Sequence, residues 1–151
     1  MSAPPPEHSL AIIRTVNASA ADIYAAWIDL PRMARWLGKV TADVRVGGRY
    51  HFESPAEGGK TYVYTGEYLA IEDGRRVKQS FLAGEPDPNT PNPYTDEFIE
   101  IRLKPLDAHR TEFTFTNGWS GESMNDEFRD AVIAAWSEWL DRMERSLSAT
   151  P

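Results

Sequence analysis

The chain has 151 residues and a mass of 17.0 kDa, which is the size of one domain. Hydrophobic residues make up 41% and aromatic residues 11%, which excludes a fully disordered chain and is enough for a hydrophobic core. Cysteine does not occur, so disulfides, thiol nucleophiles and thiolate metal sites are excluded. With 16 basic against 23 acidic residues, the net charge of −7 argues against general binding of nucleic acid or anionic lipid.

The termini are expected to lie outside the folded part. Residues 1–8 are predicted to be a disordered lead, residues 9–147 a single domain and residues 148–151 a tail. The first seven residues, with three successive prolines, lack the basic and apolar parts of a secretory signal, and no apolar run reaches the length of a membrane span. We therefore expect a cytoplasmic protein. The prolines between Gly84 and Pro93 indicate a surface loop within the domain.

The chain begins with a predicted strand over residues 10–16 and then two short helices. Ser19 is a good N-cap, and apolar residues recur after it at spacings of three and four, which predicts the first helix. Pro31 stops that helix and can open the second, which Gly38 ends. The two helices are expected to form a tight corner.

From residue 40 onward the hydrophobic period changes from 3.6 to 2, which predicts an antiparallel meander with one buried and one wet face. The expected turns lie at residues 47–48, 57–60, 73–74 and 105–109, where glycine, aspartate or proline interrupts the alternation. The expected strands cover residues 40–46, 49–53, 62–68, 77–81, 99–104 and 112–116.

A long helix closes the chain. Asn125 or Ser123 can cap it, and apolar residues from Phe128 to Leu147 form a stripe over about five turns. An antiparallel sheet must cover its apolar face, and this helix is the obvious cover. The predicted fold class is therefore α+β. A curved sheet that grips a helix leaves a space between them in which a ligand can sit.

This order of elements resembles the helix-grip fold of the START-like (SRPBCC) superfamily. Within it, the chain is most similar to the group that includes the C-terminal domain of the activator of the heat-shock chaperone ATPase. The resemblance rests on the turn and helix at residues 17–27, the Arg-x-Gly-Gly segment at 45–48, Thr-Gly-Glu-Tyr at 65–68 and Ala-Trp at 135–136. It implies a curved antiparallel sheet of about six or seven strands around the C-terminal helix. Residues 72–76 depart from the group because they lack its usual prolines.

Aromatic side chains dominate the candidate ligand-binding residues. Core packing is the plainer interpretation for most of them, because aromatics dominate ordinary cores. Tyr62, Tyr64 and Tyr68 on one strand face supply more polar groups than a sealed core requires, although the opposite register would make them a wet surface stripe. The candidate set is Trp27, Trp36, Tyr50, Phe52, Tyr62, Tyr64, Phe81, Phe113, Phe115, Asn117, Trp136, Trp139 and Met143.

Glu97 is a weak catalytic candidate. It shares strand parity with Ile99 and can face the cavity, where desolvation would weaken its acidity. The alternative is a solvated position at the start of the strand. The histidines are scattered, with His8 expected in the lead, His51 facing solvent and His109 in a turn, so no metal site is predicted. Motifs for nucleotides or a serine nucleophile are missing, and no cofactor is expected.

The leading function is the binding of a small, largely apolar or aromatic ligand between the C-terminal helix and the sheet. One alternative is an acid–base enzyme of the cyclase, hydrolase or lyase type, using Glu97, Asn117 and a hydroxyl such as that of Tyr64. Another, implied by the resemblance, is a chaperone-related interaction module. A homodimer is also open, with Trp36 or Trp119 as contact residues if they are exposed.

Overall fold

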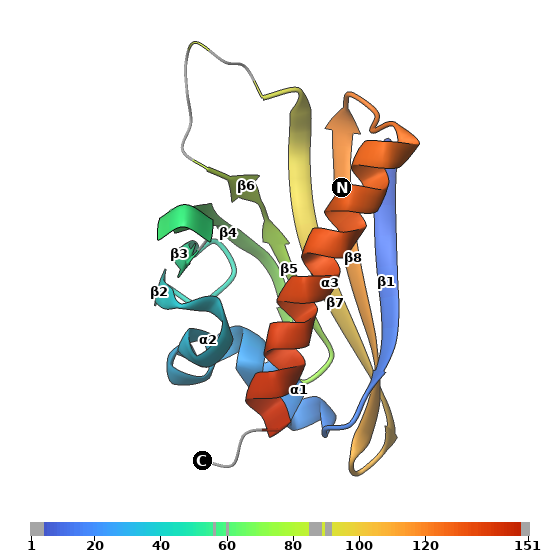
Figure 1. Cartoon of the computed structure of the whole chain (residues 1–151). Helices are drawn as coiled ribbons and strands as arrows, with labels where there is room; N and C mark the ends of the chain where they lie inside the picture. Colours follow the sequence, from blue (N-terminus) through green and yellow to red (C-terminus); the bar gives the residue numbers. More distant parts are fainter. Residues whose placement is uncertain (1–4, 56, 60, 85–88, 90–91, 149–151) are drawn as a thin grey trace.

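The computed structural model describes residues 5–55, 57–59, 61–84, 89 and 92–148, and these form an antiparallel sheet curved around one long helix (Figure 1). The strand order in the sheet is β1-β8-β7-β5-β4-β3-β2, with β6 paired to β4 beside this path. The elements in chain order are β1 (His8–Val16), α1 (Ala20–Ile28), α2 (Leu30–Leu37), β2 (Lys39–Ala42), β3 (Arg49–Pro55), η1 (Glu57–Gly59), β4 (Thr61–Glu72), β5 (Arg76–Ser80), β6 (Leu82–Ala83), β7 (Tyr94–Asp107), β8 (Arg110–Gly121) and α3 (Asp126–Ser148).

The corner formed by α1 and α2 confirms the sequence prediction. The Ser19 hydroxyl accepts a hydrogen bond from the Asp22 backbone N–H at 3.1 Å, which caps α1. Pro31 lies in the first turn of α2, and Gly38 ends that helix with a φ of 103°, a conformation that favours glycine. The Trp36 indole N–H donates to the carbonyl of Ala26 at 2.9 Å, so the corner is rigid and closes one end of the sheet.

Helix α3 covers the concave face of the sheet (Figure 1). The Asn125 side chain caps it by accepting from the Phe128 N–H at 2.8 Å. Its buried side chains are Trp136, Trp139, Leu140 and Met143. Along the edge, the Arg14 guanidinium of β1 reaches Asp141 at 2.7 Å and Glu144 at 2.5 Å, which ties the helix to the sheet.

The sheet divides at one end. Strand β5 pairs with both β4 and β7, but β6, which follows it, pairs with β4, while the start of β7 pairs with β8. The Phe81 N–H donates to the Glu97 carbonyl at 2.9 Å at the point of division. We call the division between β6 and the first residues of β7 the fork. Figure 1 shows the two arms spreading apart beyond it.

Some expected boundaries were wrong. The strand predicted over residues 40–46 ends at Ala42, because the chain then turns, with the Asp43 N–H donating to the Arg49 carbonyl. Gly48 packs so closely in this turn that a Cβ there would lie 1.9 Å from the Asp43 carbonyl oxygen. The turn predicted at 105–109 is shorter than expected, because β7 continues to Asp107.

The N-terminal boundary also differs from the expectation. His8 begins β1 instead of lying in a lead, and its ring packs on Trp119 with centroids 5.7 Å apart. The Glu7 carboxylate accepts from the Gly121 N–H at 2.8 Å, so ordered structure starts before the predicted residue 9. Among the described residues, no helix is long and apolar enough to cross a membrane.

Candidate ligand-binding site

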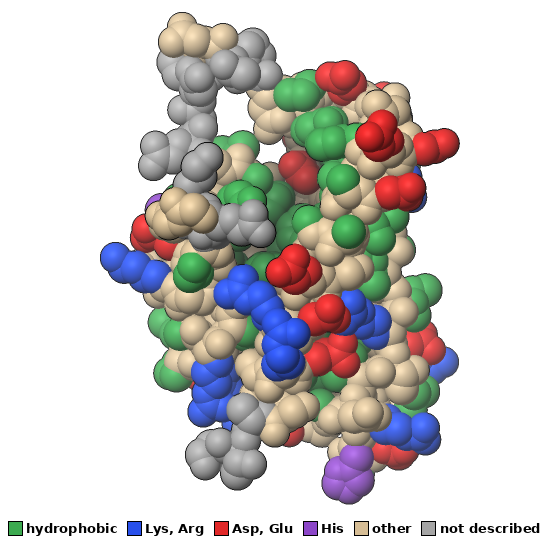
Figure 2. Space-filling model, in the orientation of Figure 1, with side chains coloured by type: hydrophobic (Ala, Val, Ile, Leu, Met, Phe, Trp, Pro, Cys, Tyr) green, Lys and Arg blue, Asp and Glu red, His purple; other side chains and the backbone are tan. Residues whose placement is uncertain are grey.

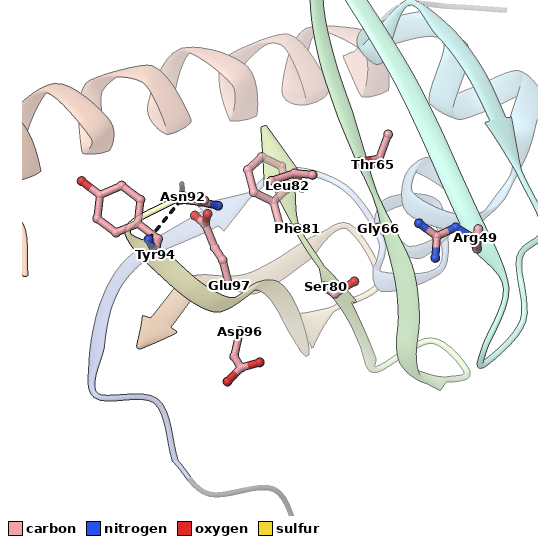
Figure 3. A pocket seen from close by; sticks show the side chains of 10 residues that line it. All are labelled: Arg49, Thr65, Gly66, Ser80, Phe81, Leu82, Asn92, Tyr94, Asp96 and Glu97. Carbon is pink, nitrogen blue, oxygen red and sulfur yellow. Dashed lines mark hydrogen bonds between the residues drawn. The ribbon is translucent and has the colours of Figure 1, made fainter. Parts of the chain in front are cut away.

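A pocket of about 290 Å³ opens at the fork, where the two arms of the sheet separate (Figure 3). It combines an aromatic and aliphatic wall with several polar side chains, as small-molecule sites do. In Figure 3 the side chains of Phe81 and Glu97 project toward α3, and Asp96 projects to the opposite side of β7. The lining residues are Arg49, Thr65, Gly66, Ser80, Phe81, Leu82, Asn92, Tyr94, Asp96 and Glu97.

A β-bulge in β7 sets the direction of Glu97. Thr95 pairs with Ser120 and Phe98 with Gly118, so Asp96 and Glu97 together oppose a single residue of β8. Asp96 has a φ of 50°, which places it in the left-handed region that aspartate tolerates better than most residues. Bulges re-aim side chains and recur beside functional sites, and this one turns Glu97 inward while Asp96 stays exposed.

Glu97 is held by a chain of hydrogen bonds that is partly buried at Glu97 and buried at Trp136. The Asn117 Nδ2 donates to Glu97 Oε2 at 3.1 Å and to the Phe98 carbonyl at 3.0 Å. The Trp136 indole N–H in turn donates to Asn117 Oδ1 at 3.1 Å. Burial raises the pKa of the Glu97 carboxyl, and the hydrogen bond from Asn117 offsets part of that rise. The protonated form of Glu97 is therefore favoured relative to a carboxyl in water.

A row of side chains crosses the concave face beside this chain of hydrogen bonds. The strand register places Tyr68 opposite Gln79, Gln79 opposite Ile99 and Ile99 opposite Asn117. The Tyr68 hydroxyl and Gln79 Nε2 are both buried, and the Tyr68 hydroxyl has no hydrogen-bond partner among the described residues, whereas the Gln79 amide interacts with the Tyr50 hydroxyl. Burial raises the pKa of Tyr68 to about 12, so its hydroxyl stays a hydrogen-bond donor. Such unpaired groups are uncommon in closed cores and suit an interior that meets polar atoms of a ligand.

Tyr50 lies on β3, beside the Tyr68 end of this row. Its hydroxyl donates to the Ser80 carbonyl at 2.6 Å, and burial holds the pKa of Tyr50 well above its ordinary value. Ser80 lines the pocket, so Tyr50 supports the wall from behind without lining it.

An aromatic cluster joins the pocket wall to the core. The ring of Phe81 lies 5.2 Å from Trp136 between centroids, and Trp136 lies 5.2 Å from Trp139. Trp139 then contacts Trp36 at 4.7 Å and Trp27 at 5.5 Å, at the end closed by the helical corner. Figure 2 shows hydrophobic side chains lining the hollow between α3 and the arm of the sheet that carries β6.

The family model described as "Activator of Hsp90 ATPase homolog 1-like protein" matches residues 17–148. The chain belongs to this family. No curated protein matches the chain.

Solved structures share the fold of this family member at low sequence identity. Protein CV1439 of Chromobacterium violaceum is 20% identical with a TM-score of 0.72, over 95% of this chain and 99% of that one. Protein NE0264 of Nitrosomonas europaea is 14% identical with a TM-score of 0.73, over 93% and 94%. Protein Ms6760 of Mycobacterium smegmatis is 18% identical with a TM-score of 0.72, over 95% and 92%. These likenesses show that the fold is shared, and the function must be argued from the site.

In this member of the Hsp90 ATPase activator homolog family, Phe81 and Glu97 are the residues of the predicted set that line the pocket. Asn117 and Trp136 adjoin it through the hydrogen bonds to Glu97. Most other predicted residues pack in the interior, and Tyr62 differs because it is 59% exposed at the outer end of β4. The buried members are Trp27, Trp36, Tyr50, Phe52, Phe113, Phe115, Trp139 and Met143, with Tyr64 partly buried beside them.

At the end of the sheet that α1 and α2 close, the predicted aromatic residues are packed in the core, which is the plainer interpretation of this set. The Trp27 indole N–H donates to the Met143 sulfur at 3.0 Å, and its ring lies against Trp36 and Phe113. Trp36 and Trp119 are each 1% exposed, so neither offers the surface on which a dimer contact was expected. The space next to the corner is filled, and the pocket lies at the opposite end of the aromatic cluster.

Sequence reasoning missed the outer wall of the pocket. Arg49, Ser80 and Asn92 come from three separate segments, and nothing in their local patterns indicates that they meet. The one available signal was the adjacent acidic pair Asp96-Glu97 at the start of an alternating strand, which suits a bulge.

The histidines do not contribute to the pocket. His51 lies on the wet face of β3, 3.3 Å from the Glu53 carboxylate, and His109 lies in the β7–β8 turn, both as expected. Within the described part of the chain, no group of three or more potential metal ligands comes together.

Proposed function

We propose that this protein binds a small, largely apolar or aromatic molecule in the pocket at the fork. The observation that carries the proposal is that one pocket joins a partly buried carboxyl, Glu97, to an aromatic wall that begins at Phe81. Ligand sites join apolar walls to convergent polar groups, and here Phe81, Leu82 and Tyr94 stand beside a lining that is otherwise mostly polar. The volume of about 290 Å³ stands near the lower end of the usual range of about 300–1,000 Å³, which favours a small ligand.

The aromatic cluster supports this proposal further. Trp136 and Trp139 pack behind Phe81 and hold its ring in place, so an aromatic ligand can stack or pack edge-on against the ordered ring of Phe81. The unpartnered Tyr68 hydroxyl lies in the same interior. A ligand with one apolar body and one or two polar atoms fits these surroundings better than a wholly apolar one.

A titration with N-phenylnaphthylamine, a neutral probe that fluoresces in apolar surroundings, tests the proposal. The matched variants are Leu82→Trp, which fills the pocket from β6, and Leu106→Trp, which makes the same change at an exposed position far from it. We expect saturable one-site binding to the wild type and to Leu106→Trp, and binding about tenfold or more weaker to Leu82→Trp. No saturable binding to the wild type, or equal binding to both variants, would contradict the proposal.

A second candidate function rests on the family match, whose description names an activator of the Hsp90 ATPase. A chaperone partner would bind an outer surface, and the fork pocket would then be incidental to function. A pull-down with the Hsp90-type chaperone of the same organism tests this candidate. A stable complex that survives the Leu82→Trp change would favour it over the small-molecule proposal.

A further inference from the structure

The chain of hydrogen bonds from Trp136 to Glu97 runs in one direction. An indole N–H can only donate, so the atom of Asn117 that meets Trp136 at 3.1 Å must be the amide oxygen. The amide nitrogen of Asn117 therefore faces Glu97 and the Phe98 carbonyl, at 3.1 Å and 3.0 Å. Asn117 is 1% exposed, and both hydrogens of its amide are used. Its orientation is fixed by its partners.

This direction favours one oxygen of Glu97 as the site of its proton. Because Asn117 donates to Oε2, that oxygen acts as the acceptor. A neutral carboxyl carries one proton, and its carbonyl oxygen is a better acceptor than its hydroxyl oxygen, so the arrangement with Oε2 as the carbonyl oxygen is favoured. The proton then lies on Oε1, which has no hydrogen-bond partner among the described residues. Since Glu97 lines the pocket, its free O–H is available to whatever the pocket holds.

The surroundings of Glu97 favour the neutral form. No lysine, arginine or histidine in the described part of the chain forms an ion pair with it, and burial is the main influence on its carboxyl. Tyr50 and Tyr94, the other titratable groups that it influences, have raised pKa values and stay neutral at ordinary pH. Asp96 projects to the other side of β7, and Arg49 lines the pocket from β3.

We propose that Glu97 determines the specificity of this site by donating a hydrogen bond from Oε1 to an uncharged oxygen acceptor of the ligand, such as a ketone, ester or amide carbonyl. Asn117 and Trp136 are positioning residues that keep the Oε1 side free to donate. The inference rests on the proposed function and adds the chemical class of the ligand, an apolar or aromatic molecule that carries a carbonyl. The side chains of Phe81 and Tyr94 stand on either side of Glu97 in Figure 3 and suit a carbonyl attached to an aromatic ring.

The test compares two probes of the same shape, methyl naphthyl ketone and isopropenylnaphthalene, which has a methylene group in place of the carbonyl oxygen. Binding is followed by quenching of tryptophan fluorescence, and circular dichroism verifies that each variant is folded. We expect the wild type to prefer the ketone about tenfold, which is the effect of one well-placed hydrogen bond. Glu97→Gln should keep this preference, because its amide accepts from Asn117 and donates N–H to the pocket. Glu97→Met should lose the preference and still bind isopropenylnaphthalene.

Trp136→Phe provides a test that does not change Glu97. The ring remains, but the N–H that fixes the Asn117 amide is lost, so Asn117 is free to turn its oxygen toward Glu97. The ratio of the affinity for the ketone to the affinity for isopropenylnaphthalene should shrink about threefold or more. If the role of Trp136 were merely structural, its replacement would weaken the binding of both probes alike.

Three results would overturn the inference and leave the proposed function intact. They are equal binding of both probes to the wild type, loss of the ketone preference in Glu97→Gln, and tighter binding of naphthoate than of the ketone. The last result would make Arg49, not Glu97, the polar anchor. If neither naphthalene probe nor N-phenylnaphthylamine binds the wild type, the proposed function fails and the inference fails with it.

Discussion

The backbone N–H of Phe81 donates to the carbonyl of Glu97 at 2.9 Å, and this bond marks the point where the sheet divides. Beyond it, Gly84 on one arm donates to Val63 of β4, and Pro93 on the other arm accepts from Glu122 after β8. Each arm therefore pairs with its own neighbour on the side that faces away from the fork. The pocket therefore results from the way in which the strands pair. Phe81 and Glu97, whose side chains characterise the pocket, are the two residues joined by the last backbone hydrogen bond between the arms.

The bulge at Asp96 gives the first prediction. Its φ of 50° is a left-handed conformation, which costs a β-branched residue about 1–2 kcal/mol or more and costs glycine little. Asp96→Val should lower the free energy of unfolding by about that amount, whereas Asp96→Gly should change it by less than about 0.5 kcal/mol. Chemical denaturation measures both.

Thr95→Val, at the exposed neighbouring position of β7, is the control for placing valine in this strand. It should be close to neutral because threonine and valine have the same branched shape. If Asp96→Val is as stable as Thr95→Val, the bulge does not depend on the left-handed residue.

Much of the fold could be predicted because side-chain alternation reports which face of a strand is buried. For Glu97 the sequence left two positions open, inward by its parity with Ile99 or solvated at the start of the strand, and in the structure its side chain projects toward α3. The fork could not be predicted, because it depends on β6 pairing with β4 through Thr65 and Leu82, residues far from β7 in sequence. Local sequence patterns indicate which face of a strand is buried, whereas tertiary contacts determine which strands pair with each other.

The same limit applies to the candidate site. Aromatic residues were correctly expected beneath α3, but the sequence does not state how well they fill that space. Trp27 and Trp36 close the corner end completely, and this depends on ring orientations such as the 4.7 Å contact between Trp36 and Trp139. The direction of the hydrogen bond from Trp136 to Asn117 likewise becomes clear only when the three-dimensional distances are known.

Gly66, which lines the pocket, should tolerate replacement poorly. A Cβ there would lie 2.0 Å from the Ser80 carbonyl oxygen and 2.7 Å from the Tyr50 ring. The Ser80 oxygen also accepts from the Tyr50 hydroxyl, so neither neighbour moves without breaking that bond. Gly66→Ala should cost about 2–3 kcal/mol in unfolding free energy, the upper part of the range for overpacking.

Gly118→Ala is the matched control for that change. The three atoms nearest to its Cβ would all belong to the outer end of the Phe98 ring, from 2.4 Å, and this side chain is only partly buried, so it can give way more cheaply than backbone. We expect a cost below about 1 kcal/mol for Gly118→Ala in the same denaturation measurement. Equal losses of unfolding free energy for Gly66→Ala and Gly118→Ala would show that Ser80 and Tyr50 shift more easily than their contacts indicate.

The Arg14 ion pairs should stabilise the attachment of α3 to β1. The Arg14 side chain is only 19% exposed, and it also donates to the Ser137 carbonyl at 3.0 Å. Arg14→Gln should therefore cost about 1–2 kcal/mol, more than a typical surface pair. Arg110→Gln removes an exposed pair with Asp107 and should cost less than about 0.5 kcal/mol. Thermal denaturation at low and high salt checks both, and a loss for Arg14→Gln no larger than for Arg110→Gln would contradict the prediction.

The titration of Glu97 should appear in the pH dependence of stability. Burial raises the pKa of this carboxyl above its ordinary value of 4.5, so the folded protein holds the proton at pH values where the unfolded chain has lost it. Stability from this group is therefore fully present below the unfolded pKa and is lost as pH rises through the folded pKa. Glu97→Gln removes the dependence. The unfolding free energy of Glu97→Gln minus that of the wild type should grow from about pH 4 upward and then level off.

The sign of this trend separates Glu97 from the other carboxyls with shifted pKa values. Glu72 and Asp107 have lowered pKa values because of Arg76 and of the His109 backbone N–H, so their contribution is lost as pH falls. Both are present in the wild type and in Glu97→Gln, and they cancel in the difference. Asp96→Asn removes a charge from the exposed side of the same bulge and serves as the control for net charge. A difference that is flat or falls with pH would mean that Glu97 is ionised in the folded protein as readily as in the unfolded chain, and the carbonyl-binding role would lose its physical basis.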